Sequence, residues 1–316
     1  MSFFASPPKP KSALGWHRIL SPNAAVKSSL FGKNEDPFKL LDAYFALGGN
    51  FIDTSNIHNS EDSEGLIGQW MEECGVRDQM VIGTKYTAGF RAYNRDKQRL
   101  QSNFTGSSVK NMHVFVRESL KKLWTGLYRH LEVLYLGVSN TPAWVVVKAN
   151  AYARANGLTP FSVYQGNWNA AHRDMEAEII PICEDQGMAI VPWAALGDGQ
   201  LMTATQRKEA EKDADARKAF HGLEPPIALC DTLERIAEQK GTTLQAIALA
   251  YLFHQSTYVF PIVGANSIAH IEAMPDANYD LSLTASDNGQ YQLAAWIEAL
   301  PQPLPYKPRK TDEEHK

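Results

Sequence analysis

The apolar positions of this chain alternate between two patterns, the 3.6-residue period of amphipathic helices and the short continuous runs of buried parallel strands. The segment 37–47 has the helical period and stops at two glycines, and the apolar run 50–54 that follows predicts a strand. The same patterns predict helices at 63–74, 108–123, 142–156, 174–186, 228–241 and 243–255, and strands at 80–85, 133–139, 161–165, 188–192 and 259–263. Strands separated by helices of this length predict an α/β fold with a parallel sheet, either doubly wound or closed as a (β/α)8 TIM barrel.

The predicted strands end in polar side chains. Asp53 ends the first of them and Lys85 the second, and Asn140, Gln165 and Trp193 end or follow later ones. In both candidate folds ligands bind at the carboxyl ends of the strands, so a site is expected where these residues meet. No Gly-x-Gly-x-x-Gly motif follows the first strand, so the sequence lacks the usual dinucleotide-binding turn of a doubly wound sheet.

Two segments fall outside the predicted elements. The polar and aromatic stretch 86–107 is either a functional loop over a strand end or a flexible insertion. Residues 301–316 are rich in proline and charge, which predicts a flexible tail. Residues 1–300 are therefore expected to form a single barrel domain.

The composition narrows the class of protein. The hydrophobic fraction of 44% and the charged fraction of 21% are ordinary for a soluble globular protein. A formal net charge of -4 without a basic helical face makes nucleic acid an unexpected partner. Cys74, Cys183 and Cys230 lie far apart without CxxC spacing, which predicts reduced thiols. No secretory leader and no run of 18 apolar residues occur, so a cytoplasmic protein without a membrane segment is expected.

A series of short phrases follows the order of a known family. The phrase Gly-Gly-Asn-Phe-Ile-Asp-Thr at 48–54 is followed by Ser63-Glu64. Further phrases are Thr84-Lys85-Tyr86, Gly137-Val138-Ser139-Asn140, Tyr164-Gln165-Gly166, the turn from Pro192-Trp193 to Gly199, and Pro261-Ile262-Val263-Gly264. Together they resemble the aldo-keto reductase family. The phrases at 136–146 and 163–166 narrow the resemblance to fungal aryl-alcohol dehydrogenases, including the norsolorinic acid reductase-like members of polyketide toxin pathways.

The resemblance implies a (β/α)8 barrel that binds NADP(H) and interconverts a small aromatic carbonyl and its alcohol by hydride transfer, without a metal. The family uses an Asp, a Tyr, a Lys and a His. The phenol protonates the alkoxide, the ammonium lowers the pKa of that phenol, the carboxylate holds the lysine, and the imidazole orients the carbonyl.

Only part of this catalytic set is recognisable. By position, the Asp corresponds to Asp53 and the Lys to Lys85, whereas the position of the Tyr holds His58. An imidazolium can donate a proton near neutral pH, but a cationic Lys85 beside it would lower its pKa and leave it mostly neutral. The alternative is that His58 is a loop histidine with no chemical role.

The resemblance also implies contacts with the nicotinamide end of the cofactor. Ser139, Asn140 and Gln165 would bind the carboxamide, and Trp193 would stack on the ring. The alternative is that these residues are polar caps of strand ends and a core tryptophan.

The adenosine end is expected after the last predicted strand. Relatives carry basic residues there that pair with the 2′-phosphate, but residues 265–270 contain no Arg or Lys. Asn266 and Ser267 are the remaining candidates for hydrogen bonds to this phosphate. A preference for NADPH over NADH is therefore not predicted.

Two parts of the expected barrel are weak or missing. The first strand should precede the helix 37–47, but residues 26–36 offer only the short phrase Leu30-Phe31-Gly32. The strand that should carry the family's His has only residues 124–132 available, whereas a complete βαβ unit needs about 30 residues. With six predicted strands, an incomplete barrel is expected, through a real deletion or a mis-drawn exon join.

Three functions are consistent with these residues. The first is the oxidoreductase that the resemblance implies. The second is a pseudoenzyme that retains dinucleotide binding. The third is an isomerase or dehydratase that uses His58, Asp53 and Lys85 for proton transfer without a hydride step. The chain as written is expected to show no NADPH oxidation with aromatic aldehydes or ketones.

Overall fold

The computed structural model describes residues 19–20, 36–89, 91–123, 133–210, 212, 227–256, 258–265 and 267–272. The strands in this part of the chain are β1 (Ile19–Leu20), β2 (Phe51–Asp53), β3 (Val81–Gly83), β4 (Gly137–Ser139), β5 (Val163–Asn167), β6 (Ala189–Trp193) and β7 (Ile262–Val263). The helices are α1 (Pro37–Ala46), α2 (Asp62–Cys74), α3 (Val109–Lys122), α4 (Ala143–Ala155), α5 (Ile179–Gln186), α6 (Ala204–Ala210), α7 (Ile227–Lys240), α8 (Leu244–Gln255) and α9 (Ile268–Glu272). The α/β class with parallel strands is confirmed.

The strands form two parallel sheets that are joined by one bridge. One sheet has the order β3-β2-β1-β7 and the other the order β4-β5-β6. Ile190 of β6 bridges to Val259, with the Ile190 amide donating to the Tyr258 carbonyl and the Phe260 amide donating to the Ile190 carbonyl, both at 2.8 Å. Through this bridge the strands follow one another as β3-β2-β1-β7-β6-β5-β4, which leaves β3 and β4 as the two outer strands.

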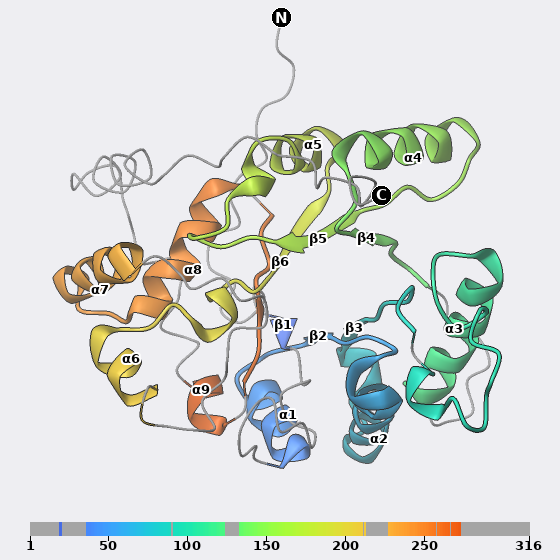
Figure 1. Cartoon of the computed structure of the whole chain (residues 1–316), viewed down its shortest axis with the longest axis horizontal. Coiled ribbons are helices and arrows are strands. Elements are labelled where there is room, and N and C mark those ends of the chain that lie inside the picture. The colour runs from blue at the N-terminus through green and yellow to red at the C-terminus, as the bar shows by residue number, and fades with distance from the viewer. Residues whose placement is uncertain are drawn as a thin grey trace, which may run out of the picture.

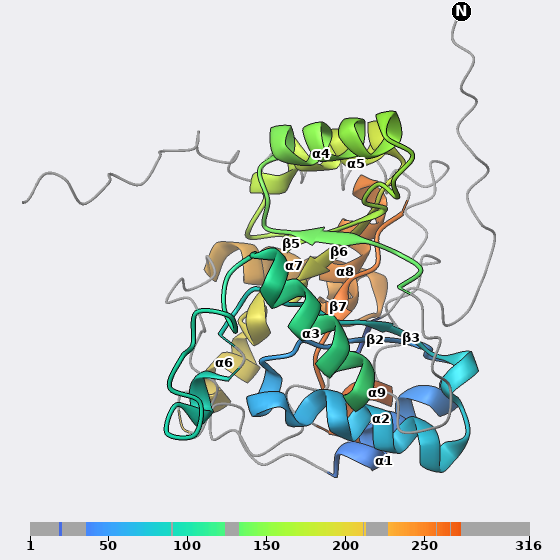
Figure 2. The same ribbon diagram turned by 90° about the vertical axis from the view of Figure 1, so that its right-hand side faces the viewer.

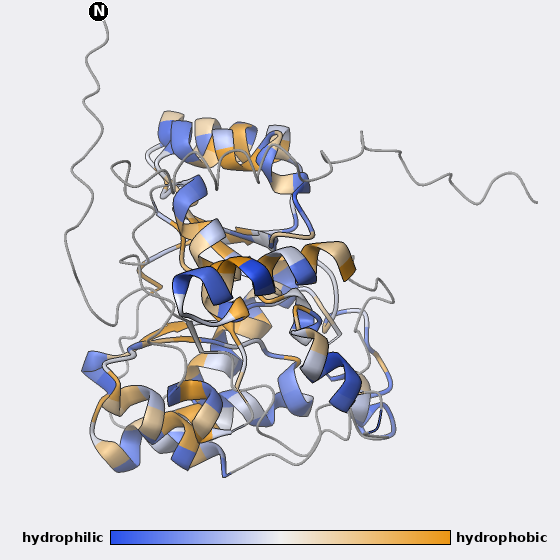
Figure 3. Cartoon of the chain, turned by 90° about the vertical axis from the view of Figure 1, so that its left-hand side faces the viewer, coloured by the Kyte–Doolittle hydropathy of each residue, from blue (hydrophilic) through white to orange (hydrophobic). Residues whose placement is uncertain are grey.

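The helices lie outside the strands. α4 and α5 cover the outer side of the β4-β5-β6 sheet, and α1 and α2 lie on the opposite side of the molecule, beyond the other sheet (Figures 1 and 2). Most helices mix hydrophilic and hydrophobic residues along their length, as expected when one face meets solvent (Figure 3). α8 differs, because nine of its twelve residues are buried.

Local signals explain where several helices begin and end. The Asp36 carboxylate accepts a hydrogen bond from the Phe38 amide at 3.0 Å at the start of α1. Ser108 and Thr243 cap α3 and α8 in the same way, at 3.2 and 3.1 Å. Gly75 ends α2 with a φ of 63°, a left-handed conformation that glycine adopts without a steric cost.

Alternation along the strands separates an outer face from an inner one. In β2, Ile52 packs outward against α1 and α2, while Phe51 belongs to a cluster between the two sheets. The residues of this inner cluster are Val191, Ile262, Phe51, Val163, Trp193 and Phe260. Asp53 lies two residues beyond Phe51, so it shares the inner face at the carboxyl end of its strand.

The first strand lies earlier in the chain than predicted. β1 pairs with Phe51 and Ile52 on one side and with Ile262 and Val263 on the other. The first strand, expected within 26–36 and predicted to be weak or missing, is thus present at 19–20. Residues 26–35 lie outside the described part of the chain. Two apolar residues are too few to produce a recognisable period, so β1 gives almost no signal in the sequence.

The two outer strands are shorter or more exposed than predicted. β4 covers only the last three residues of the expected strand, and Val133, Leu134 and Tyr135 before it are 56%, 69% and 69% exposed. Val81 of β3 is 42% exposed. An apolar run that is read as an interior strand becomes partly exposed when it stands at a sheet edge.

The remaining segments are only partly described. The described residues of the loop 86–107 are irregular, as expected, apart from a short 3-10 helix at Ala92–Asn94. α6 and α9 were not predicted, because helices of seven and five residues are too short to show a helical period. The expected gap at 124–132 and the expected tail at 301–316 lie outside the described residues.

Candidate active site

Asp53, Lys85 and Gln165 come together in the fold: Asp53 ends β2, Lys85 follows β3 by two residues, and Gln165 lies in the middle of β5. Lys85 Nζ lies 2.5 Å from Asp53 Oδ1 and donates a second hydrogen bond to the Thr54 carbonyl at 2.9 Å. Gln165 Nε2 donates to the same Asp53 oxygen at 3.0 Å, although the two residues belong to different sheets. The Asp53 side chain is 8% exposed and that of Lys85 is 28% exposed, so a buried carboxylate holds an ammonium that solvent can still reach.

Backbone pairing positions this ion pair. Asp53 is in register with Gly83 in the parallel ladder between β2 and β3. The pairing continues beyond the strands, because the Thr54 amide donates to the Gly83 carbonyl at 2.8 Å and the Asn56 amide to the Lys85 carbonyl at 3.2 Å. Backbone hydrogen bonds beyond the carboxyl ends of the two strands therefore fix the positions from which the Asp53 and Lys85 side chains project.

Asn140 and Trp193 form a second pair beside the first. Trp193 Nε1 donates to Asn140 Oδ1 at 3.2 Å, and the Asn140 amide donates to the Gln165 carbonyl at 3.1 Å. Asn140 has a φ of 47°, a left-handed conformation that asparagine tolerates better than most residues. Ser139 and Asn140 are exposed, whereas Gln165 and Trp193 are half-buried.

His58 lies in the loop after β2, and its imidazole is neutral. Burial, and secondly the nearby Lys85 ammonium, lower the pKa of His58 from 6.5 to about 3. Its Nδ1 is buried without a hydrogen-bond partner among the described residues. The predicted direction of this pKa shift is confirmed, and it removes the imidazolium as a proton donor near pH 7.

The depressed pKa of His58 predicts a pH dependence of stability. Unfolded His58 takes up a proton below pH 6.5, while the folded protein does not until about pH 3, so stability falls as the pH decreases through this window. We expect the unfolding free energy to fall by about 1 kcal/mol between about pH 7.5 and about pH 5.5 from this group. Denaturant titrations at both pH values measure the effect.

The matched variants separate His58 from other titrating groups. His58→Gln is expected to reduce the loss of stability between the two pH values, whereas His113→Gln, at an exposed histidine of α3, serves as the control. An equal loss in the wild type and in His58→Gln would contradict the assignment.

The expected adenosine end is described only in part. Ser267 Oγ accepts a hydrogen bond from the His270 amide at 3.3 Å, at the start of α9. Asn266 lies outside the described residues. The structure therefore brings together Asp53, Lys85 and Gln165, but no contact connects Ser267 to them in the described part of the chain.

Three charged residues near the site were not predicted as a group. Glu61 and Glu64 both contact Lys122, at 3.0 and 2.6 Å. Glu64 is fully buried and also accepts a hydrogen bond from Thr84 Oγ1 at 2.7 Å. Of these three residues, only Glu64 belongs to a recognisable sequence motif, the phrase Ser63-Glu64. Lys122 is distant in sequence and belongs to no motif, so its contacts could not be predicted.

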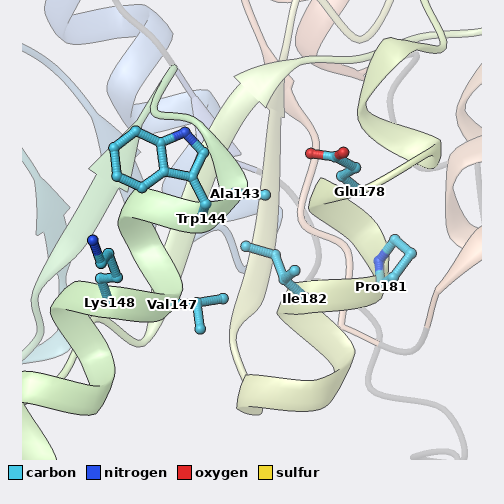
Figure 4. A pocket seen from close by; sticks show the side chains of 7 residues that line it. All are labelled: Ala143, Trp144, Val147, Lys148, Glu178, Pro181 and Ile182. Carbon is cyan, nitrogen blue, oxygen red and sulfur yellow. The ribbon is translucent and has the colours of Figure 1, made fainter.

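An apolar pocket lies away from this site, between α4 and α5. Trp144, Val147 and Lys148 line it from α4, and Pro181 and Ile182 line it from α5 (Figure 4). Lys148 Nζ lies 5.4 Å from the centre of the Trp144 ring. None of the candidate site residues contributes to this pocket.

The three cysteines are free, as predicted, and burial raises the pKa of the Cys183 thiol to about 12. Among the described residues, no group of three or more His, Cys, Asp and Glu side chains could hold a metal ion. Within the same residues, no helix has the length and apolar character needed to cross a membrane.

The sequence matches a known family model, described as the aldo/keto reductase family, over residues 29–130 and 132–293. The chain therefore belongs to the aldo/keto reductase family, and it is an oxidoreductase by that membership.

Its relatives include fungal proteins of two named activities. Norsolorinic acid reductase A of Aspergillus parasiticus is 40% identical, with 84% of this chain and 77% of the relative covered. Aryl-alcohol dehydrogenase [NADP(+)] of Phanerodontia chrysosporium is 38% identical, with 90% and 87% covered.

Two features of these matches bear on the length of the chain. The family model is interrupted between residues 130 and 132, within the short segment that separates α3 from β4. A norsolorinic acid reductase of Emericella nidulans is 34% identical over 380 positions, with 96% of each chain covered. Because this chain has 316 residues, part of that relative has no counterpart here inside the matched span.

Proposed function

We propose that the protein is an NADP(H)-dependent oxidoreductase that interconverts an aryl carbonyl and its alcohol, in fungal secondary metabolism. The observation that carries this proposal is the Lys85 ammonium, held at 2.5 Å by the buried Asp53 carboxylate and open to solvent on its other side. Gln165 completes the arrangement from the second sheet. The names of two relatives, norsolorinic acid reductase A and aryl-alcohol dehydrogenase [NADP(+)], support the choice of reaction.

The residues present fit the nicotinamide end of the cofactor. Asn140 and Gln165 offer amide groups and Ser139 a hydroxyl, which are suitable partners for a carboxamide. Trp193 contributes an aromatic face to the inner cluster beside them. The bound cofactor supplies the hydride, and these residues would hold its ring against the substrate.

The proton donor is the weak part of the site. At the place of the family's phenol stands His58, whose pKa of about 3 leaves it neutral. A histidine with this pKa is also a weak base, which disfavours the alternative of a non-redox isomerase or dehydratase. We therefore expect NADPH oxidation by this chain to lie at or below the limit of detection with aromatic aldehydes and ketones.

We further propose that residues 1–300 form a single domain of the (β/α)8-barrel type. This barrel would lack one strand-helix unit between β3 and β4. The strand order supports this, because β3 and β4 are the outer strands of the seven that are described. The interruption of the family match after residue 130 and the 380-position match support it independently. Sequencing the transcript and the genomic DNA across codons 123–133 tests it, since an encoded but skipped strand would identify a mis-drawn exon join.

Titration with NADPH, followed by its fluorescence, tests the proposed cofactor site. We expect saturable binding that weakens by about tenfold in Gln165→Leu, because a hydrogen bond to the cofactor and one to Asp53 are lost together. Asn156→Ala, which removes an exposed amide at the end of α4, is the matched control. Binding without turnover would favour a pseudoenzyme, whereas the absence of binding would refute the proposed function.

The residues expected at the adenosine end of the cofactor predict weak discrimination between NADPH and NADH. A charge-assisted hydrogen bond is worth about 1.5–3 kcal/mol, and residues 264–272 offer no Arg or Lys to make one. We expect the dissociation constants of NADPH and NADH to differ by less than about tenfold. Ser267→Arg should shift this ratio toward NADPH. A ratio above about one hundred in the wild type would contradict the prediction.

A further inference from the structure

Glu61 is the centre of a group of contacts beside the candidate site. Its Oε2 lies 3.0 Å from Lys122 Nζ, at the end of α3. Its Oε1 accepts a hydrogen bond from the Tyr93 hydroxyl at 3.0 Å and lies 3.5 Å from Arg91 Nε. The Glu61 side chain is 13% exposed, which limits the screening of these charges by water. One carboxylate thus links the loop after β2, the loop after β3 and α3.

The backbone that carries Glu61 is strained. Asn59, Ser60 and Glu61 have φ values of 49°, 57° and 81°, and none of them is glycine. A run of this kind persists only where surrounding contacts hold it. Asn59 Nδ2 donates to Ser63 Oγ at 2.8 Å, and Glu61 supplies the contacts at the other end of the run. The run starts directly after His58, whose own amide donates to the Ser55 carbonyl at 3.1 Å.

The loop 86–107 is attached to the same carboxylate. The loop leaves β3 directly after Lys85, and its ends are joined where the Gly106 amide donates to the Thr87 carbonyl at 2.6 Å. Arg91 Cζ lies 4.9 Å from the centre of the Phe104 ring, within the loop. Arg91 therefore connects the interior of the loop to Glu61, and it also pairs with Glu118 of α3, whose Oε2 lies 3.3 Å from Arg91 Nη2.

A second carboxylate, that of Glu64, connects Lys122 to Thr84, the residue before Lys85. Glu64 accepts a hydrogen bond from Thr84, which precedes Lys85, and pairs with Lys122 at 2.6 Å. A Cβ atom at Gly68 would collide with the Lys122 carbonyl oxygen, so α2 and α3 approach each other closely here. Lys122 is therefore held firmly enough to serve both carboxylates.

We propose that Glu61 is a positioning residue that fastens the loop 86–107 to the loop after β2 and thereby forms the substrate-facing wall of the site. The loop starts at Lys85 and the strained run starts at His58, so Glu61 connects the segments that follow both candidate catalytic residues. This inference rests on the proposed function for its substrate. Its structural part, the attachment of the loop, does not depend on turnover.

Limited trypsin digestion of the full chain tests the attachment of the loop. Arg91, Arg95, Lys97 and Arg99 provide cleavage sites within it. We expect Glu61→Ala to raise the rate of cleavage in the loop at least tenfold and Tyr93→Phe, which removes one contact, to raise it less. Glu73→Ala is the matched control, because Glu73 lies on the exposed side of α2, where it accepts a hydrogen bond from Gln69. Equal cleavage in Glu61→Ala and Glu73→Ala overturns the proposal.

Ligand binding separates positioning of the substrate from general damage. We expect Glu61→Ala to weaken the binding of benzaldehyde to the NADPH-loaded protein at least fivefold, measured by cofactor fluorescence, while the dissociation constant of NADPH changes less than twofold. Glu61→Gln keeps the acceptor for Tyr93 and should fall between wild type and Glu61→Ala. Weakening of both ligands by the same factor overturns the proposal, as does unchanged benzaldehyde binding in the variant with the cleavable loop.

The outcomes also distinguish this inference from the proposed function. Absence of NADPH binding to the wild type refutes the proposed function, while the trypsin comparison still decides whether Glu61 fastens the loop. If Glu61→Ala does not fold, Tyr93→Phe and Glu61→Gln provide the same comparison with smaller changes. In that case, wild-type rates of loop cleavage in both variants overturn the proposal.

Discussion

Replacement of His58 by tyrosine is expected to raise the rate of NADPH oxidation with an aromatic aldehyde by about 10²-fold, at the lower end of the range for general acid catalysis. The imidazole of His58, with a pKa of about 3, is neutral and cannot act as an imidazolium donor. A phenol at this position would stand beside the Lys85 ammonium, which favours the phenolate form and makes the phenol a better acid. Initial rates at saturating NADPH measure the change.

A second variant shows whether the hydroxyl is responsible for that gain. His58→Phe introduces a ring of similar shape without a proton to donate, and it is expected to stay at the wild-type rate. A similar increase in both variants would mean that relief of an unfavourable buried imidazole, rather than proton donation, accounts for the result. An unchanged rate in His58→Tyr would show that the missing strand, and not position 58, limits turnover.

Removal of the Lys85 ammonium is expected to abolish the activity gained by His58→Tyr. Lys85→Met in that background should lower kcat/KM by about 10²-fold or more, because the phenol loses the cation that makes it acidic. Lys148→Met removes an ammonium that lies over Trp144, far from the Asp53 carboxylate in the fold, and serves as the control. Retained turnover in Lys85→Met would exclude the ion pair as the catalytic centre.

The same substitution has a readout that needs no turnover. The pKa of His58 is lowered first by burial and then by the charge of Lys85. In Lys85→Met the second cause is absent, so the pKa of His58 should rise while staying below 6.5. A titration of His58 followed by NMR measures this shift, and an unchanged value would mean that the two residues are not close enough to interact.

The sequence predicted most of the helices and the polar ends of the strands. Helices longer than two turns are visible from their period, and α1, α3 and α8 are also bounded by capping residues such as Asp36, Ser108 and Thr243. β1 was not predicted, because a strand of two residues is too short to show a hydrophobic period. The exposure of Val81 could not be predicted, because a sequence pattern does not show whether an apolar strand has a neighbouring strand on both sides.

The candidate site was predictable only where residues fall at strand ends. Asp53 ends β2 and Lys85 follows β3, so parallel topology alone requires them to lie at one edge of the strands. Gln165 was predicted at a strand end, but it lies in the middle of β5 and reaches Asp53 from there. The contacts of Glu61 with Arg91 and Lys122 depend on how a loop folds back and where a helix ends. Long-range ion pairs of this kind leave no spacing pattern, so they become visible only in the folded chain.

The strand pairing has a consequence for the order in which the protein folds during synthesis. β4, β5 and β6 are consecutive in the chain, so their sheet can form as soon as residues 137–193 have left the ribosome. The other sheet needs β7, from near the end of the described chain, to pair with β1 from near its beginning. A nascent chain that stops before Ile262 carries Asp53 and Lys85 but cannot complete the sheet that supports them. The sheet that carries both candidate site residues is thus completed only after β7 has been synthesised.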